Sequence, residues 1–272
     1  MTDKGDLPSF RKPPVIEVIC GVQFEAIKEF SSVHFGRFLS RTAPEYPSTQ
    51  DREPLSDVFE GQRGPEVTDQ VVALSFSLPP LRRVFYVDKT GNYLLQVQPS
   101  RFLANWRKQR EEDEYPHFEA TYARFRNGWQ QFRDFLIDER LPAPRANQYE
   151  LTYINHVFEA TTPFPVGMEE HFGLFTWRER RALKFLPSPR AAQARLQFPL
   201  PDSKGTLHVT ITHGARLPDK KAVMVVDFTA RGPARSDWSD MEAWFSVAHE
   251  WIVKGFTDLT TAEAHTRWER ER

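Results

Sequence analysis

The sequence predicts an α+β protein built from two similar halves, each ordered β-α-β-β-β-α, with a mostly antiparallel sheet and two long amphipathic helices packed on it. Three observations carry this prediction. Val15 to Ala26 and Tyr149 to Phe158 both alternate apolar and polar residues, as half-buried strands do. Three further strand-like segments follow each of these stretches, and a long segment with apolar residues at helical spacing closes each half.

The first strand has one apolar and one polar face. Its apolar face consists of Ile16, Val18, Cys20, Val22 and Phe24. Glu17, Gln23 and Glu25 fall on the other face. Ser31 and Ser32 then offer an N-cap for a short helix from His34 to Arg41, and Pro44 to Thr68 has the prolines, glycines and missing period of a long loop.

The remainder of the first half predicts three strands and a helix. The strands are Val71 to Leu78, Val84 to Asp88 and Asn92 to Gln98, of which the last two form a hairpin through a turn that contains Gly91. The helix carries an apolar stripe made of Phe118, Tyr122, Phe125, Trp129, Phe132 and Leu136. Since these residues are three or four positions apart, they lie along one side of the helix.

The second half repeats this order. A short helix is expected within Met168 to Phe175, and the strands are Ala194 to Leu200, Thr206 to Thr212 and Ala222 to Ala230. The closing helix, from about Met241 to Leu259, has a stripe made of Met241, Trp244, Phe245, Ala248, Ile252 and Phe256. Leu141 to Pro144 contains two prolines and sets the boundary between residues 1–141 and 142–272. The pattern leaves open whether the halves share one sheet or form separate domains.

Composition limits the classes of function. Lys and Arg number 36 against 37 Asp and Glu, so the net charge of −1 gives no global attraction to nucleic acid or anionic lipid. The single cysteine, Cys20, lies on the apolar face of its strand, which is typical of a buried thiol, and it excludes an internal disulfide. No segment resembles a signal peptide or a membrane span. We therefore expect a cytoplasmic protein with no membrane association.

Several sequence blocks are similar to those of a known family. They are Pro13–Val18, Leu95–Gln98 with Arg101–Phe102, Asn105–Lys108, Asn147–His156, and Phe256–Thr261 with His265 and Trp268. In these blocks the chain resembles a sporadically distributed prokaryotic family of similar length, to which no biochemical activity is assigned. The blocks cover both ends and the centre of the chain. The resemblance implies a bacterial cytosolic protein and carries over no catalytic residue.

No motif for catalysis, cofactor binding or a metal survives inspection. His249 and Glu250 lack the second zincin histidine, because the position four residues after His249 is Val253. His208 and His213 fall on opposite faces of one strand and cannot share a metal ion there. The glycines form no phosphate-binding loop. We therefore expect no cofactor and no metal, and an enzyme is the less favoured class.

One segment departs from an evenly mixed charge. Between Trp177 and Arg195, six basic residues oppose one acid, and aromatic residues lie among them. Such a loop is able to contact phosphates and stack on bases, although a solvated connector has the same composition. A second basic and aromatic spot precedes the first long helix. The candidate nucleic-acid contacts are Arg178, Arg180, Arg181, Lys184 and Arg190 in the segment, with Arg107 and Lys108 in the second spot.

Polar residues at the end of an apolar strand either satisfy buried backbone groups or line a cleft. Asn155 and His156 end the first strand of the second half, so we regard them, with Trp106, as candidate cleft-lining residues. The leading hypothesis is a non-enzymatic binding or accessory protein that holds a protein or peptide partner, in a bacterial defence or toxin-antitoxin type of module, by the cleft between its halves or by the loop from Pro44 to Thr68. The alternatives are RNA or DNA binding through the basic segment, and an enzyme that uses scattered residues such as His156, His249 and Glu250. The oligomeric state stays open.

Overall fold

The structure is a computed structural model that describes residues 7–60, 81–175, 185–216, 219–234 and 238–272. The elements of the first part of the chain are β1 (Val15–Phe24), α1 (Ser32–Thr42), β2 (Ser48–Arg52), β3 (Arg83–Val87), β4 (Tyr93–Gln98), β5 (Arg101–Arg107) and α2 (His117–Asp138). The later elements are β6 (Ala146–Phe158), η1 (Val166–Glu170), β7 (Gln193–Pro199), η3 (Pro201–Ser203), β8 (Thr206–Ala215), β9 (Ala222–Pro233), α3 (Trp238–Leu259) and α4 (Ala262–Arg267).

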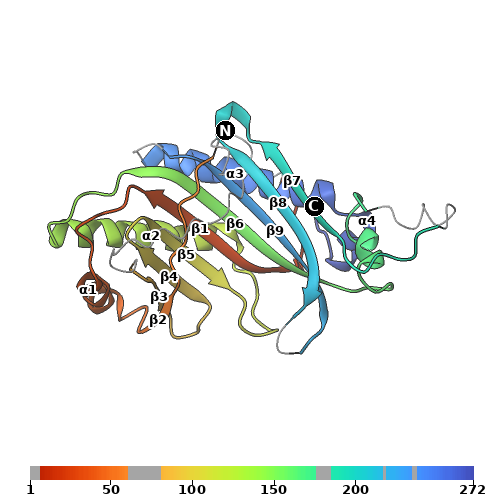
Figure 1. Cartoon of the computed structure of the whole chain (residues 1–272), viewed down its shortest axis with the longest axis horizontal. Helices are drawn as coiled ribbons and strands as arrows, with labels where there is room; N and C mark the ends of the chain where they lie inside the picture. The colour runs from red at the N-terminus through yellow and green to blue at the C-terminus, as the bar shows by residue number, and fades with distance from the viewer. Residues whose placement is uncertain (1–6, 61–80, 176–184, 217–218, 235–237) are drawn as a thin grey trace. The chain divides into compact units, whose positions relative to one another are not determined.

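The strands form a nine-stranded sheet in the order β2-β3-β4-β5-β1-β6-β9-β8-β7 (Figure 1). Neighbours pair antiparallel, as in the register of β4 with β5, where Leu95 lies opposite Ala104. Helices pack on this sheet. The predicted α+β class with a large antiparallel sheet is therefore confirmed.

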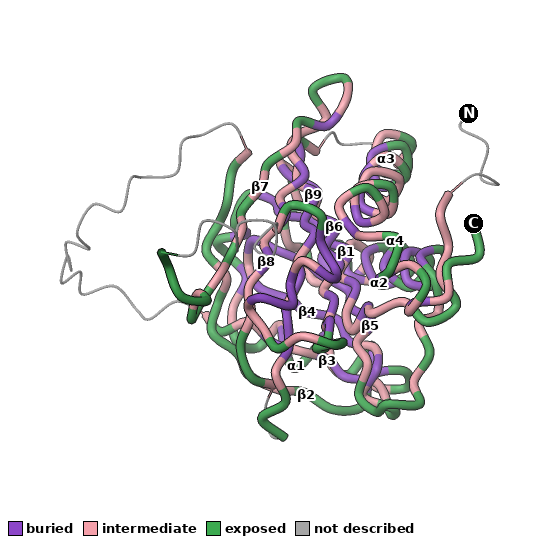
Figure 2. Tube along the Cα trace, turned by 90° about the vertical axis from the view of Figure 1, so that its right-hand side faces the viewer, coloured by how far each residue is buried: buried purple, intermediate pink, exposed green. Residues whose placement is uncertain are grey.

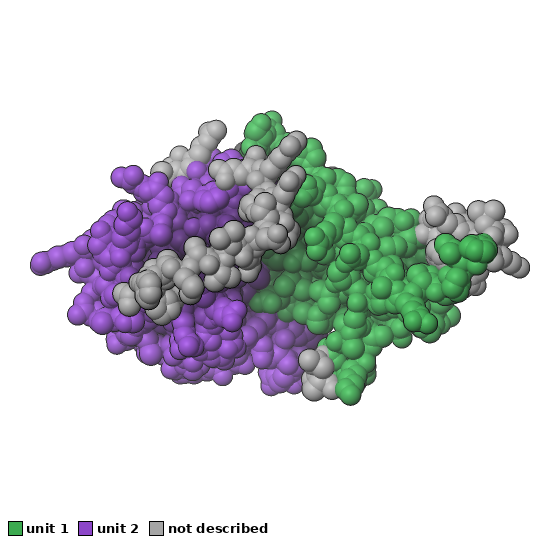
Figure 3. All heavy atoms as spheres, viewed as in Figure 1, with its two compact units in different colours: residues 1–18, 151–230, 243–272 green, residues 19–150, 231–242 purple. Residues whose placement is uncertain are grey.

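The chain divides into two compact units, which are described separately (Figure 3). Unit 1 contains residues 1–18, 151–230 and 243–272, and unit 2 contains residues 19–150 and 231–242. Segments of β1, β6 and β9 belong to each unit. The boundary between residues 141 and 142 stays a prediction.

Aromatic packing between one face of the strands and α2 forms the core of unit 2. Trp129 and Phe132 of α2 lie with ring centroids 5.6 and 5.4 Å from Phe102 of β5. A Cβ atom on Gly128 would come within 2.9 Å of the Leu95 side chain, so any larger residue here requires that side chain to shift. Cys20, on the same face of β1 as Phe24, is buried, and burial raises the pKa of its thiol well above the usual value. Figure 2 shows that residues of the central strands are buried.

The core of unit 1 lies between α3 and strands β8 and β9. Phe256 of α3 contacts Phe228 of β9 edge-on at 5.8 Å between centroids. The buried Trp244 donates its indole N–H to the Lys204 carbonyl oxygen at 2.8 Å. The chain breaks after α3 and begins again at Thr261, whose hydroxyl caps α4 by accepting a bond from the Ala264 N–H group. Trp268, which follows α4, is buried.

Three local predictions need correction. The loop from Pro44 contains strand β2, which was missed because its residues Ser48–Arg52 are mostly exposed and lack apolar alternation. The basic and aromatic spot at residues 105–108, interpreted as preceding the first long helix, falls mostly within strand β5 (Arg101–Arg107). The short helix expected within 168–175 is the 3-10 helix η1, which begins earlier. The strand expected at 71–78 lies outside the described residues.

Candidate functional site

A set of polar side chains lies on the side of the unit 2 strands opposite α2. Strand alternation places it there, because Phe24, Phe102 and Val97 point toward the helix and their sequence neighbours point away. We call this set the polar face. It consists of Gln23, Gln98, Ser100, Arg101 and Gln148, each with only 3–8% of its surface exposed. Buried polar groups require hydrogen-bond partners, so what covers these side chains matters.

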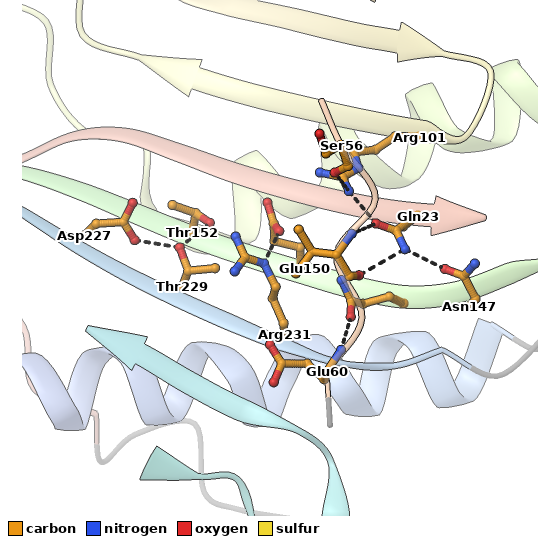
Figure 4. A network of polar contacts seen from close by, with 12 residues as sticks. Gln23, Ser56, Glu60, Arg101, Asn147, Glu150, Thr152, Asp227, Thr229 and Arg231 are labelled. Carbon is orange, nitrogen blue, oxygen red and sulfur yellow. Dashed lines mark hydrogen bonds and ion pairs between the residues drawn. The ribbon is translucent and has the colours of Figure 1, made fainter. Parts of the chain in front are cut away.

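A short segment of the same unit, Leu55–Glu60, covers the polar face, and we call it the strap. Its residues meet the strands in spatial order (Figure 4). Leu55 bonds to Gln98 of β4, Ser56 to Arg101 of β5, Val58 to Gln23 of β1 and Glu60 to Gln148 of β6. The strap therefore crosses four neighbouring strands and does not pair with any of them as a further strand.

Two glutamines hold the strap through paired amide bonds. The Gln98 carboxamide accepts from the Leu55 N–H group at 2.9 Å and donates to the Leu55 carbonyl oxygen at 2.9 Å. The Gln23 carboxamide likewise accepts from the Val58 N–H group and donates to the Val58 carbonyl oxygen, both at 3.1 Å. Gln148 accepts from the Glu60 N–H group at 3.1 Å. A carboxamide has the donor and acceptor of a peptide group, so these side chains act as partners for the main chain.

The strap is attached by its main chain and not by apolar side chains. Val58 and Phe59 expose 38% and 43% of their surface, and Ser56 and Asp57 are also exposed. The Asp57 side chain also takes part, since it accepts a bond from the Ser100 hydroxyl at 2.9 Å. The strap therefore adds little apolar burial, and hydrogen bonds of about 1 kcal/mol each account for its attachment.

Arg101 is a buried cation beneath the strap. Its Nη2 group donates to the Ser56 carbonyl oxygen at 3.1 Å and to the Gln23 carboxamide oxygen. Its Nε atom is buried and has no hydrogen-bond partner in the described part of the chain. Burial lowers the pKa of Arg101, while the charges of Glu150 and Asp57 oppose that effect. Glu150 is itself bonded to Arg231 at 2.5 Å.

This arrangement is suited to binding and offers no evident reaction centre. The polar face contains three carboxamides, a hydroxyl and a guanidinium, none of which is an activated nucleophile. Among the residues that the structure describes, no three His, Cys, Asp or Glu side chains are grouped as metal ligands. The chemistry that the face does provide is recognition of peptide groups and of negative charge.

Most of the predicted nucleic-acid contacts cannot be placed. Arg178, Arg180, Arg181 and Lys184 lie outside the described residues, and Arg190 is exposed in unit 1. In unit 2, Arg107 ends β5 and donates to the Gly91 carbonyl oxygen at 3.0 Å, and Lys108 follows it half-buried. The nucleic-acid hypothesis therefore stays untested by these positions.

The candidate cleft and enzyme residues are held by local contacts. Trp106 is buried, with its ring centroid 5.4 Å from that of Tyr115. Asn155, in unit 1, is buried and donates to the Val226 carbonyl oxygen at 3.2 Å, and burial lowers the pKa of the half-buried His156. The ring centroid of His249 lies 6.2 Å from that of Tyr153, and Glu250 pairs with Lys254. None of these side chains belongs to the polar face.

Sequence reasoning placed Gln23 on the polar side of β1 but assigned it no role. Gln98 ended a predicted strand, and Gln98, Arg101 and Gln148 otherwise appeared only within blocks of family resemblance. A usable signal existed for the glutamines, because glutamine is uncommon at buried strand positions and β1, β4 and β6 each contain one beside an apolar neighbour. The strap itself gave no signal, because a segment held by its main chain has no required side-chain pattern.

Comparison of the chain with protein-family models and with curated proteins finds no match. Within the described ranges, no helix combines the length and the apolar character needed to cross a lipid bilayer.

Proposed function

We propose that this protein is a non-enzymatic binding protein that holds an extended peptide segment of a protein partner on the polar face of unit 2. The observation that carries the proposal is the pair of two-bond contacts between the Gln98 and Gln23 carboxamides and the main chain of Leu55 and Val58. These contacts are those of a peptide-binding surface, and the strap is the peptide that occupies it.

The spacing of the contacts fits an extended chain. Neighbouring strands are about 4.8 Å apart, so the three steps from β4 to β6 span roughly 14 Å. Five residues of extended chain, the separation of Leu55 from Glu60, span about 16 Å. A peptide in extended conformation is therefore able to satisfy one polar-face side chain for each strand that it crosses.

Exchange of the strap for a partner is energetically feasible. The strap leaves Val58 and Phe59 exposed, so its release exposes little additional apolar surface. Its main-chain groups are solvated by water once released, which offsets most of the lost hydrogen bonding. The strap competes from within the same chain, however, at an effective concentration on the order of millimolar. A free peptide must overcome this competition.

The test uses full-length protein in which the strap is weakened. Substituting Leu55→Pro and Val58→Pro removes the two main-chain N–H groups that donate hydrogen bonds to Gln98 and Gln23. The matched control carries Ser56→Pro and Phe59→Pro, because the N–H groups of these two residues donate no bond within the described chain. Fluorescence anisotropy then measures binding of a labelled peptide with the sequence of residues 53–60.

We expect the peptide to bind the Leu55→Pro/Val58→Pro protein at least about tenfold more tightly than the control protein, since each lost bond to the strap contributes about 1 kcal/mol. Adding Gln23→Leu and Gln98→Leu to the weakened protein should abolish this binding. Equal affinity for both proline variants, or binding that survives loss of both glutamines, would overturn the proposal.

Three finer predictions accompany this function as proposals. We propose that the two halves arose by duplication, which the shared pattern β1-α1-β3-β4-β5-α2 and β6-η1-β7-β8-β9-α3 supports. The relation to the sporadically distributed prokaryotic family rests on the sequence blocks given above. A cytoplasmic role in a bacterial defence or toxin-antitoxin type of module would suit a binding protein whose partner is encoded nearby.

A further inference from the structure

We infer that the polar face selects extended peptides that carry a carboxylate at the position of Asp57, which Ser100 and Arg101 recognise. This inference rests on the proposed function and adds a side-chain requirement to main-chain recognition. The partner is then an extended segment with an aspartate or glutamate at its centre. The strap, which carries Asp57, competes with that segment for the polar face.

Ser100 is oriented to donate to an anion. Its hydroxyl oxygen accepts a bond from the Gln98 Nε2 group at 3.2 Å, which leaves the hydroxyl proton free to point elsewhere. That proton is directed to the Asp57 carboxylate at 2.9 Å. Gln98 also pairs with the Leu55 main chain. One glutamine therefore positions both the main chain of the strap and the Ser100 hydroxyl, which donates to the carboxylate.

Arg101 supplies the positive charge. Only 6% of its surface is exposed, and a guanidinium so far removed from water is stabilised by nearby anions, of which Glu150 raises its pKa more than Asp57 does. Its buried Nε atom has no acceptor within the described part of the chain, so the strap does not use the full bonding capacity of this side chain. A charged acceptor in the same place forms stronger hydrogen bonds than a neutral one.

The geometry favours a carboxylate on an extended chain over a free anion. Arg101 donates to the carbonyl oxygen of Ser56, the residue before Asp57, so the cation contacts the main chain next to the acid. The two flanking glutamines fix the positions of Leu55 and Val58, which leaves two residues between them to carry the acid. The sugar-phosphate backbone of a nucleic acid lacks the paired N–H and C=O groups that these glutamines bind along a peptide.

The test compares two synthetic peptides of the strap sequence, one with Asp at position 57 and one with Asn. Each is titrated into full-length Leu55→Pro/Val58→Pro protein with and without the mild substitution Ser100→Ala. Asn retains the size of the side chain and removes its charge. We expect the Asp peptide to bind at least about tenfold more tightly than the Asn peptide, as charged hydrogen bonds imply. In the Ser100→Ala protein this ratio should fall to about threefold or less.

The outcomes separate the two proposals. Equal affinity of the two peptides would overturn the carboxylate requirement and leave the peptide-binding function intact. Failure of both peptides to bind would overturn the proposed function, and the inference with it. If Ser100→Ala left the ratio of the two peptides' affinities unchanged, a group other than Ser100 would bind the carboxylate, and the role assigned to Ser100 would be wrong. The peptide comparison alone tests the inference if the Ser100→Ala protein does not fold.

Discussion

Gln23 is the most connected side chain of the polar face, so its replacement tests how the strap is held. It accepts bonds from the Val58 N–H group and from Arg101, and it donates to the Val58 carbonyl oxygen and to Asn147. Leucine has a similar volume, so Gln23→Leu removes these bonds without a large cavity. With the strap in place, two main-chain groups of Val58 would lack partners, each at a cost of about 1–3 kcal/mol.

Release of the strap avoids that cost, because Val58 returns to water. The loss that remains is the net contribution of the strap's hydrogen bonds, about 1 kcal/mol each, so the free energy of unfolding should fall by about 1–3 kcal/mol. Hydrogen exchange over residues 53–60, followed by mass spectrometry, should be at least about tenfold faster than in the unmodified protein. Urea denaturation measures the accompanying change in stability.

Gln130→Leu is the matched control, since Gln130 is an exposed residue of α2 whose side chain, within the described part of the chain, bonds only to Asp134. This control should leave exchange in the strap unchanged. The reasoning would be refuted if Gln23→Leu left strap exchange unchanged. A loss of stability above about 5 kcal/mol without faster strap exchange would identify Gln23 as a core residue and not as the holder of a detachable segment.

Three further predictions concern the rest of the chain. Trp129→Ala and Trp244→Ala should each destabilise by about 3–5 kcal/mol in chemical denaturation, because both rings are buried, and a loss under about 1 kcal/mol would contradict their place in a core. Burial, and to a smaller extent the charge of Arg267, lower the pKa of His171 to about 4. In the unfolded chain the same imidazole has a pKa near 6.5, so it binds a proton between pH 6.5 and 4 that the folded state does not. Stability should therefore be full above pH 6.5 and fall by up to about 3 kcal/mol as the pH drops to about 4, and a His171→Asn protein with the same pH profile would contradict this. Oligonucleotides at about 0.15 M salt should not bind at micromolar concentration, whereas binding lost in an Arg178, Arg180 and Arg181 to alanine variant would favour the nucleic-acid hypothesis.

Elements with one apolar and one polar face were readable from sequence. The alternation of apolar and polar residues located β1 and β6 to within a few residues. Apolar residues three or four positions apart located α2 and α3. β5 escaped because its polar residues, such as Arg101 and Asn105, are buried along with its apolar ones. Its sequence therefore looked like a basic and aromatic surface spot.

The site was not readable because its contacts are distant in sequence and made by the main chain. Gln23 and Val58 are 35 residues apart, and Gln148 and Glu60 are 88 apart. Main-chain bonds impose no side-chain pattern on the strap, so the loop from Pro44 onward showed only that a long connection exists. The sequence hypothesis that this loop serves a binding role stays a prediction. The proposed function assigns that role to Leu55–Glu60, the strap within the loop.

The most direct test of the central claim is the crystal structure of the full-length Leu55→Pro/Val58→Pro protein with the peptide of residues 53–60 bound. The account predicts that the peptide lies across β4, β5, β1 and β6 with its main chain paired to the Gln98 and Gln23 carboxamides, in place of the strap. A peptide bound elsewhere, or a strap that stays on the polar face beside a bound peptide, would contradict it.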